Sequence, residues 1–183
     1  MNRRTASRLL AVLALSISLT ACGDDGESSS DGQGAAEPTA QACETRPGTA
    51  AAPAEVSTDL TVAPEVPGSD EAPPCALVIS DVVVGTGPEA VDGSTVALKY
   101  AGAFYETGEE FDSSWSRGAE ETLPVTVGAG QVIAGFEEAI RGMQVGGRRM
   151  VTIPSDLGYG PAGQGPIPGD ATLVFVLDLV SVS

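Results

Sequence analysis

The residues best suited to chemistry in this sequence are aromatic and lie in its second half. All phenylalanine, tyrosine and tryptophan residues of the 183-residue chain fall between Tyr100 and Phe175, and histidine is absent. Without histidine, the sequence excludes a Ser-His-Asp hydrolase and a metal enzyme with histidine ligands. Aromatic rings could line an apolar binding pocket, although the same rings could simply fill a hydrophobic core.

The N-terminal segment has the layout of a secretory signal. Arg3, Arg4 and Arg8 precede an apolar run over 9–19, and Leu-Thr-Ala-Cys follows at 19–22. This last motif resembles the lipoprotein box of bacteria, which implies removal of residues 1–21 and attachment of acyl chains such as palmitate to Cys22. The resemblance predicts an exported protein held by lipid on the outer face of the cell membrane. An ordinary cleaved signal with a coincidental cysteine is the alternative.

Residues 22–73 are predicted to form a flexible acidic linker. The segment is rich in alanine, serine, glycine and proline, and its only basic residue is Arg46. Large apolar side chains are too scarce there to offset the entropy lost on ordering the chain. In an oxidising, exported setting, Cys43 and Cys75 are expected to form a disulfide, with two free thiols as the alternative.

The charge of the chain is strongly negative. The 25 acidic and 9 basic residues give a formal net charge of −16. Such a chain repels nucleic acid and anionic membrane surfaces, so no nucleic-acid partner is expected, and the charge mainly supports solubility.

From residue 74 to residue 183 the pattern changes to short β-strands. Strands are expected over 77–84, 94–105, 123–127, 148–153 and 172–182, with a loop rich in proline and glycine over 154–170. One helix is predicted over 135–141, because Phe136, Ala139, Ile140 and Met143 form a single apolar stripe. The expected fold is therefore α+β, with a curved antiparallel sheet around one short helix.

Five segments of this domain resemble the FKBP class of peptidyl-prolyl isomerases, which is named for binding tacrolimus. They are VALKYAGAF (96–104), EEFDSSW (109–115), VTVGAGQVIAGFEEAIRGMQVGGRRMVTIP (125–154), LGYG (157–160) and IPGDATLVFVLDLV (167–180). They occur in family order and cover nearly the whole domain. The resemblance implies a sheet of five or six antiparallel strands curled around a short helix, and isomerase activity. The lipid box adds a bacterial source, and the alanine-rich acidic linker is typical of high-GC actinobacteria.

The resemblance also assigns the site residues. They are Tyr100, Phe111, Asp112, Val132, Ile133, Phe136, Tyr159, Ile167 and Phe175. Asp112 is expected to shape the polar side near the imide carbonyl. Tyr159 and the Ile167 backbone are expected to hydrogen-bond substrate carbonyls, and the others to hold the proline ring.

Three further positions bear on this assignment. Phe136 stands where the family often has tryptophan, and Leu123 where it often has an aromatic residue, so weak affinity for tacrolimus-like macrolides is expected. Phe104 and Tyr105 are interpreted as structural, and Trp115 is expected at the edge of the pocket.

An apolar pocket could accelerate rotation about an X-Pro bond without a nucleophile, metal or cofactor. The planar imide loses its resonance as it twists, and a dry pocket disfavours the more polar planar form. The expected partners are proline-containing segments of exported proteins, whose folding the enzyme would assist, and the expected state is a monomer. Two alternatives remain: a module that grips proline peptides without catalysis, and a domain retained for partner assembly.

Overall fold

Six strands, one α-helix and three short 3-10 helices make up the regular secondary structure of the described residues. The structure is a computed structural model that describes residues 43–44, 48–50 and 53–183, so Cys22 and the predicted signal peptide lie outside the described residues. The elements are β1 (Val78–Val83), β2 (Thr95–Phe104), β3 (Glu110–Ser113), β4 (Leu123–Thr126), α1 (Ala134–Ile140), β5 (Arg148–Ile153) and β6 (Leu173–Val182). Within the described ranges, no helix is long and apolar enough to cross a membrane.

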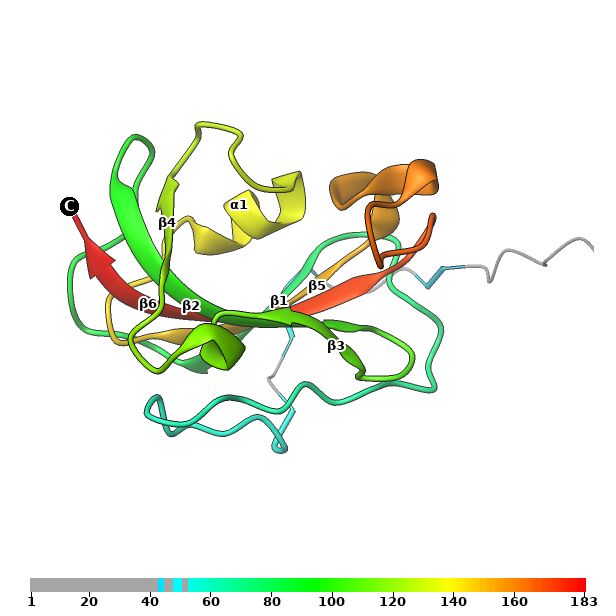
Figure 1. Ribbon diagram of the computed structural model, residues 1–183, viewed down its shortest axis with the longest axis horizontal. Helices are drawn as coiled ribbons and strands as arrows, with labels where there is room; N and C mark the ends of the chain where they lie inside the picture. Colours follow the sequence, from blue (N-terminus) through cyan, green and yellow to red (C-terminus); the bar gives the residue numbers. More distant parts are fainter. Residues whose placement is uncertain (1–42, 45–47, 51–52) are drawn as a thin grey trace, which may run out of the picture. The chain divides into compact units, whose positions relative to one another are not determined.

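The strands form one antiparallel sheet in the order β1-β5-β6-β2-β3, with β4 paired to β2. The sheet curls around α1, as Figure 1 shows. This arrangement confirms the predicted α+β class. The sequence pattern placed five of the strands within two residues of their observed ends. It missed β3, which has only four residues and follows a tight turn.

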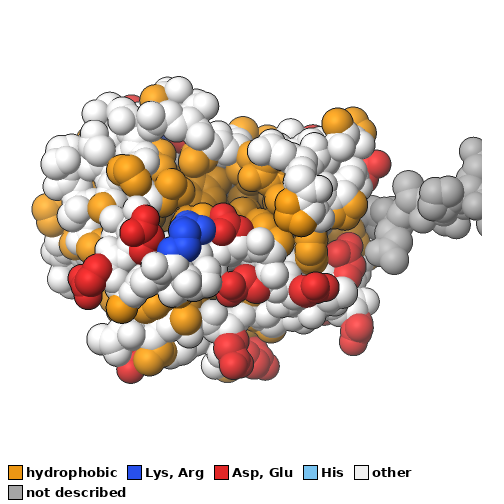
Figure 2. All heavy atoms as spheres, viewed as in Figure 1, with side chains coloured by type: hydrophobic (Ala, Val, Ile, Leu, Met, Phe, Trp, Pro, Cys, Tyr) orange, Lys and Arg blue, Asp and Glu red, His pale blue; other side chains and the backbone are white. Residues whose placement is uncertain are grey.

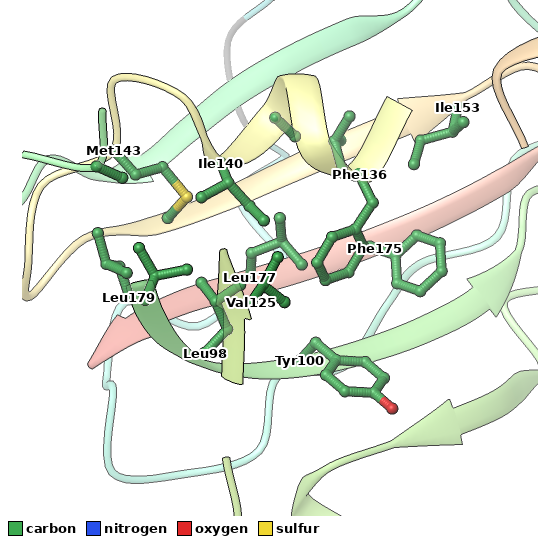
Figure 3. Close-up of a cluster of buried hydrophobic side chains, with 14 of the residues drawn as sticks. Leu98, Tyr100, Val125, Phe136, Ile140, Met143, Ile153, Phe175, Leu177 and Leu179 are labelled. Carbon is green, nitrogen blue, oxygen red and sulfur yellow. The ribbon is translucent and has the colours of Figure 1, made fainter. Parts of the chain in front are cut away.

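The main hydrophobic core lies between α1 and the concave face of the sheet (Figure 3). Phe136, Ala139, Ile140 and Met143 are all buried, which confirms the apolar stripe predicted for the helix. Burying each large side chain of this kind contributes about 1.5–3 kcal/mol. The core therefore fixes α1 against the strands that carry the candidate site.

Residues 53–73, which we call the strap, lie against the opposite, convex face of the sheet. Val56 of the strap is 3% exposed. Arg148 on β5 is fully buried, pairs with Asp178 on β6, and donates hydrogen bonds to the Ser57 and Val62 carbonyl oxygens at 2.7 and 3.1 Å. Because the strap covers this face, β6 is buried without interruption over 173–179. Residues 53–73, which the sequence predicted to be part of a flexible linker over 22–73, are thus held against the sheet by buried contacts despite their few apolar side chains.

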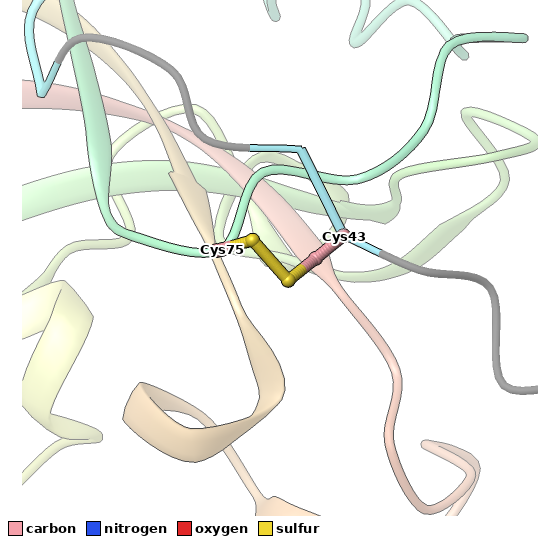
Figure 4. The surroundings of a disulfide bond; sticks show 2 residues. All are labelled: Cys43 and Cys75. Atoms are coloured by element: carbon pink, nitrogen blue, oxygen red, sulfur yellow. A yellow bond between two sulfur atoms is a disulfide. The ribbon is translucent and has the colours of Figure 1, made fainter.

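The predicted disulfide joins Cys43 to Cys75 across the ends of the strap (Figure 4). The two Cα atoms are 5.0 Å apart, and 32 positions separate the residues in sequence. Hydrogen bonds from the Glu44 N–H to the Pro73 carbonyl and from the Cys75 N–H to the Glu44 carbonyl support the crossing. The disulfide thus closes a loop that contains the whole strap.

Candidate functional site

A cavity of about 150 Å³ opens between the concave face of the sheet and the start of α1. Figure 2 shows a hollow lined with hydrophobic side chains on this side of the molecule. The residues that line the cavity are Tyr100, Phe111, Asp112, Leu123, Gln131, Val132, Ile133, Phe136, Tyr159 and Phe175. Eight of the nine predicted site residues are therefore brought together. The ninth, Ile167, lines an adjoining cavity of about 260 Å³ that also contacts Phe111, Asp112 and Tyr159.

Phe175 on β6 lies at the centre of the aromatic cluster. Its ring meets the rings of Phe111 and Phe136 edge to face, with centroid distances of 5.5 and 5.2 Å. Tyr100 makes a further edge contact with Phe136 at 6.1 Å. Figure 3 shows Tyr100, Phe136 and Phe175 converging from β2, α1 and β6. Edge-to-face pairs fix ring orientation as well as burying area, so the walls of the cavity are held in place before a ligand arrives.

A glycine on β2 makes this aromatic arrangement possible. Gly102 is the register partner of Phe175 on β6. A Cβ atom at position 102 would lie 2.6 Å from Phe175 Cε1 and 2.9 Å from Phe111 Cζ. Since carbon atoms pack no closer than about 3.5 Å, only glycine lets both rings approach the strand.

The polar edge of the cavity is a network of three side chains. The Tyr100 hydroxyl donates to Asp112 Oδ2 at 2.5 Å, while Arg117 donates to Asp112 Oδ1 at 2.7 Å and to the Tyr100 oxygen at 2.8 Å. Burial and the bond to Asp112 raise the pKa of Tyr100. Partial burial would raise the pKa of Asp112, but the hydrogen bonds from Tyr100 and Arg117 outweigh it and hold that pKa below its usual range.

Arg117 was missed by sequence reasoning. It lies in a short 3-10 helix, Trp115–Arg117, that follows β3. In the sequence it resembles any solvated arginine of a surface loop. Only the five-residue spacing from Asp112 hinted that a turn could bring the two side chains together.

Some hydrogen-bonding groups near the cavity already have a partner within the protein, and others do not. The Ile167 N–H donates to the Gln164 carbonyl at 2.9 Å, and the Ile167 carbonyl accepts from the Gln164 N–H at the same distance. The role predicted for the Ile167 backbone therefore requires a substrate to share or displace this bond. Among the described residues, the Tyr159 hydroxyl and the Ile133 N–H have no hydrogen-bond partner, and burial raises the pKa of Tyr159.

The remaining aromatic residues lie around the site without forming its wall. Trp115, predicted at the pocket edge, does not line the cavity, and its ring packs under the Lys99 ammonium at 4.0 Å. Phe104 supports the wall from behind, with its ring centroid 5.2 Å from that of Phe111. Tyr105 is buried, and its hydroxyl lies 3.4 Å from the Ala72 carbonyl oxygen in the strap.

Comparisons with known proteins point to one family. Residues 87–180 match the family model of the FKBP-type peptidyl-prolyl cis-trans isomerase. An FK506-binding protein of Streptomyces anulatus is 49% identical over 121 residues, which cover 65% of this chain and 96% of that protein. A "Probable FK506-binding protein" of Corynebacterium glutamicum is 51% identical over 105 residues, covering 57% and 86%. The crystal structure of AtFKBP13 aligns with a TM-score of 0.54 at 35% identity, over 58% of this chain and 93% of that one.

The matched region contains every residue that lines the aromatic cavity. The strap and the disulfide lie before residue 87, where the family model begins. The cavity therefore lies within the residues that the family model matches, whereas the strap lies before them.

Proposed function

Because the chain belongs to the family of FKBP-type peptidyl-prolyl cis-trans isomerases, we propose that its aromatic cavity binds the proline ring of a polypeptide and catalyses rotation about the preceding imide bond. The observation that carries this proposal is the rigid cluster of edge-on rings around Phe175. It offers a pyrrolidine ring an apolar, preformed site.

The walls of the cavity favour the twisted imide over the planar one. Rotation about an X-Pro bond has a barrier of about 20 kcal/mol, because the planar form is stabilised by resonance. The planar form is also the more polar, so transfer from water into the cavity destabilises it more than the twisted form. Phe111, Phe136 and Phe175 exclude water from the bond while this rotation takes place.

The polar groups hold the peptide on either side of the rotating bond. The Ile133 N–H and the Tyr159 hydroxyl are donors that face no acceptor among the described residues, so they are suited to substrate carbonyls. Asp112 is kept ionised and in place by Tyr100 and Arg117, and it sets the negative potential beside the imide carbonyl. The three-residue network thus positions the carboxylate, while the aromatic rings bind the substrate.

The names of the relatives lead us to propose a weaker interaction with FK506-type macrolides. FK506 binding is stated for the Streptomyces anulatus protein. In this chain Phe136 offers a smaller ring than tryptophan and Leu123 is aliphatic, so a bulky macrolide would lose contact area. We expect measurable but reduced affinity.

The cellular setting is part of the same proposal. The signal-like residues 1–21 and the lipid-box Cys22 support export and lipid anchoring, and a disulfide suits an oxidising compartment. There a monomeric isomerase would assist the folding of exported proteins, since X-Pro rotation can limit folding. Cell fractionation tests this: a Cys22→Ser variant should leave the membrane fraction, and retention there would exclude the lipid anchor.

The activity itself is tested by following cis–trans relaxation of X-Pro peptides with the full chain in mild detergent. Wild type should accelerate relaxation above the uncatalysed rate, and the Phe175→Ala variant should lose most of this effect. Circular dichroism must show that the variant is folded. If a folded wild type binds proline peptides but accelerates none of them, the chain is a binding module and the isomerase proposal is wrong.

A further inference from the structure

The aromatic cavity continues into a groove that extends away from the proline site. The adjoining cavity of about 260 Å³ shares Phe111, Asp112 and Tyr159 with the aromatic cavity. A third cavity, of about 510 Å³, shares Pro166 with the second and lies between the β2–β3 turn and the loop before β6. We call the second and third cavities together the outer groove.

The far end of the outer groove is acidic. Glu106, Glu109 and Asp170 line it and are exposed, and no lysine or arginine lines either part of the groove. Within the described part of the chain, none of these three side chains forms an ion pair, whereas Asp112 is paired with Arg117. Figure 2 shows acidic side chains around the hydrophobic hollow on this face. The groove therefore presents carboxylates that nothing in the described structure neutralises.

The walls between the proline site and these carboxylates are largely apolar, with Asp112 and Gln164 as polar members of the second cavity. Phe104, Pro166 and Pro168 line the third cavity, and the Phe104 ring lies 5.2 Å from that of Phe111. An apolar channel that ends in carboxylates matches the side chain of lysine or arginine, which has a hydrocarbon stem and a charged head.

We propose that the outer groove selects substrates that carry a lysine or arginine in the segment flanking the proline. This inference rests on the proposed function, because the proline ring would occupy the aromatic cavity. An extended peptide advances about 3.3–3.6 Å per residue, so residues beyond the proline would run along the groove towards Glu106, Glu109 and Asp170. The three acidic residues then determine specificity, while the aromatic cavity performs the rotation.

The experiment compares matched peptides with the full chain in mild detergent. Each pair has one Leu-Pro core and either a lysine or a glutamine at a set distance from the proline, scanned on both sides. Catalysed rotation is measured by exchange NMR, and affinity by calorimetry. At the best position, catalytic efficiency and affinity for the lysine peptide should exceed those for its glutamine twin by about three- to tenfold, and salt should reduce the ratio.

A triple variant tests the assignment to these residues. Glu106→Gln, Glu109→Gln and Asp170→Asn remove the charges and keep the shapes, and asparagine tolerates the positive φ of 61° at position 170. This variant should lose the lysine preference but keep wild-type efficiency on glutamine peptides. The control is Glu89→Gln, Glu120→Gln and Glu121→Gln, which removes the same formal charge from exposed positions outside the groove and should keep the preference.

The outcomes separate this inference from the proposed function. If lysine and glutamine peptides are bound and isomerised equally well, or if both triple variants lose the lysine preference to the same extent, the proposed role of the outer groove is wrong. The isomerase proposal would still stand. If no peptide is isomerised but lysine peptides bind more tightly through the three carboxylates, the groove is supported and the isomerase is overturned.

Discussion

The Tyr100 hydroxyl is where the apolar and polar halves of the site meet. It donates to Asp112 and accepts from Arg117, while its ring contacts Phe136. One atom therefore orients a carboxylate and an arginine at the mouth of the cavity. Removing it leaves the ring, so its contribution can be separated from that of the aromatic wall.

The Tyr100→Phe variant should weaken both stability and catalysis. Loss of the hydroxyl removes one hydrogen bond from Asp112 and one from Arg117, so we expect the free energy of unfolding to fall by about 1 kcal/mol. Catalytic efficiency in the X-Pro relaxation assay should fall by about fivefold, equivalent to about 1 kcal/mol. Tyr105→Phe is the control, because Tyr105 does not line the cavity, and it should leave catalysis unchanged. Equal catalysis by Tyr100→Phe and wild type would remove the hydroxyl from the mechanism.

The lowered pKa of Asp112 predicts an acid-dependent loss of stability. A carboxyl group whose pKa is lower in the folded state stabilises the fold at pH values above its unfolded pKa, whose usual value is 3.8. This contribution is lost as the pH falls through the lower, folded pKa. The difference in unfolding free energy between wild type and Asp112→Asn should therefore be constant from pH 7 to about pH 5 and shrink below about pH 4. Urea titrations across this range measure it, and a difference independent of pH would contradict the prediction.

At the scale of elements, the strap depends on one buried arginine. Arg148 has no exposed side-chain surface and makes two hydrogen bonds to Asp178 and two to strap carbonyl oxygens. Detaching the strap would leave the buried guanidinium group with fewer hydrogen-bond partners and no water to replace them. Arg148 therefore holds the strap firmly on the sheet.

The Arg148→Met variant should destabilise the protein by about 3–5 kcal/mol, because Asp178 is left buried without its partner. Limited proteolysis should then cut within 53–73 before it cuts the strands. Arg141→Met is the control: Arg141 pairs with Asp92 at a similar distance of 2.7 Å, but both are exposed, so the loss should be much smaller. A double Arg148→Met, Asp178→Leu variant should recover part of the stability. Comparable losses at 148 and 141 would contradict the anchoring role.

The sequence predicted some elements of the fold and missed others. Alternating apolar residues located β2, and the stripe from Phe136 to Met143 located α1, because both periods are set by burial on one face. The strap has no such period. Its attachment depends on backbone carbonyl oxygens that meet Arg148, and composition does not show where a carbonyl points.

The residues of the candidate site, too, were predicted only in part. The cavity residues were predicted through the family resemblance, and the structure gathers eight of the nine around one cavity. Arg117 and the role of Gly102 escaped prediction, because a loop arginine and a strand glycine have many ordinary explanations. Only the distances to Asp112, Phe111 and Phe175 distinguish them.

At the scale of the whole molecule, the disulfide and the buried arginine act on the same segment. The disulfide closes the loop from Cys43 to Cys75, and Arg148 holds the middle of that loop on the convex face. The aromatic cavity lies on the other face, and neither the two cysteines nor Arg148 line it. A change that detaches the strap should therefore lower the free energy of unfolding without lowering catalytic efficiency.

Removing the disulfide tests that separation. The Cys43→Ser, Cys75→Ser variant should lose about 3–4 kcal/mol of unfolding free energy, as chain entropy predicts for a loop of this length. Its catalytic efficiency on X-Pro peptides should match wild type, because the cavity walls are fixed by the helix and sheet. Combined with Arg148→Met, the total loss should be smaller than the sum of the single losses, since a strap that is already released gains little from its crosslink. Additive losses would mean that the two devices stabilise different parts of the molecule, and a drop in catalysis would mean that the strap supports the cavity through the sheet.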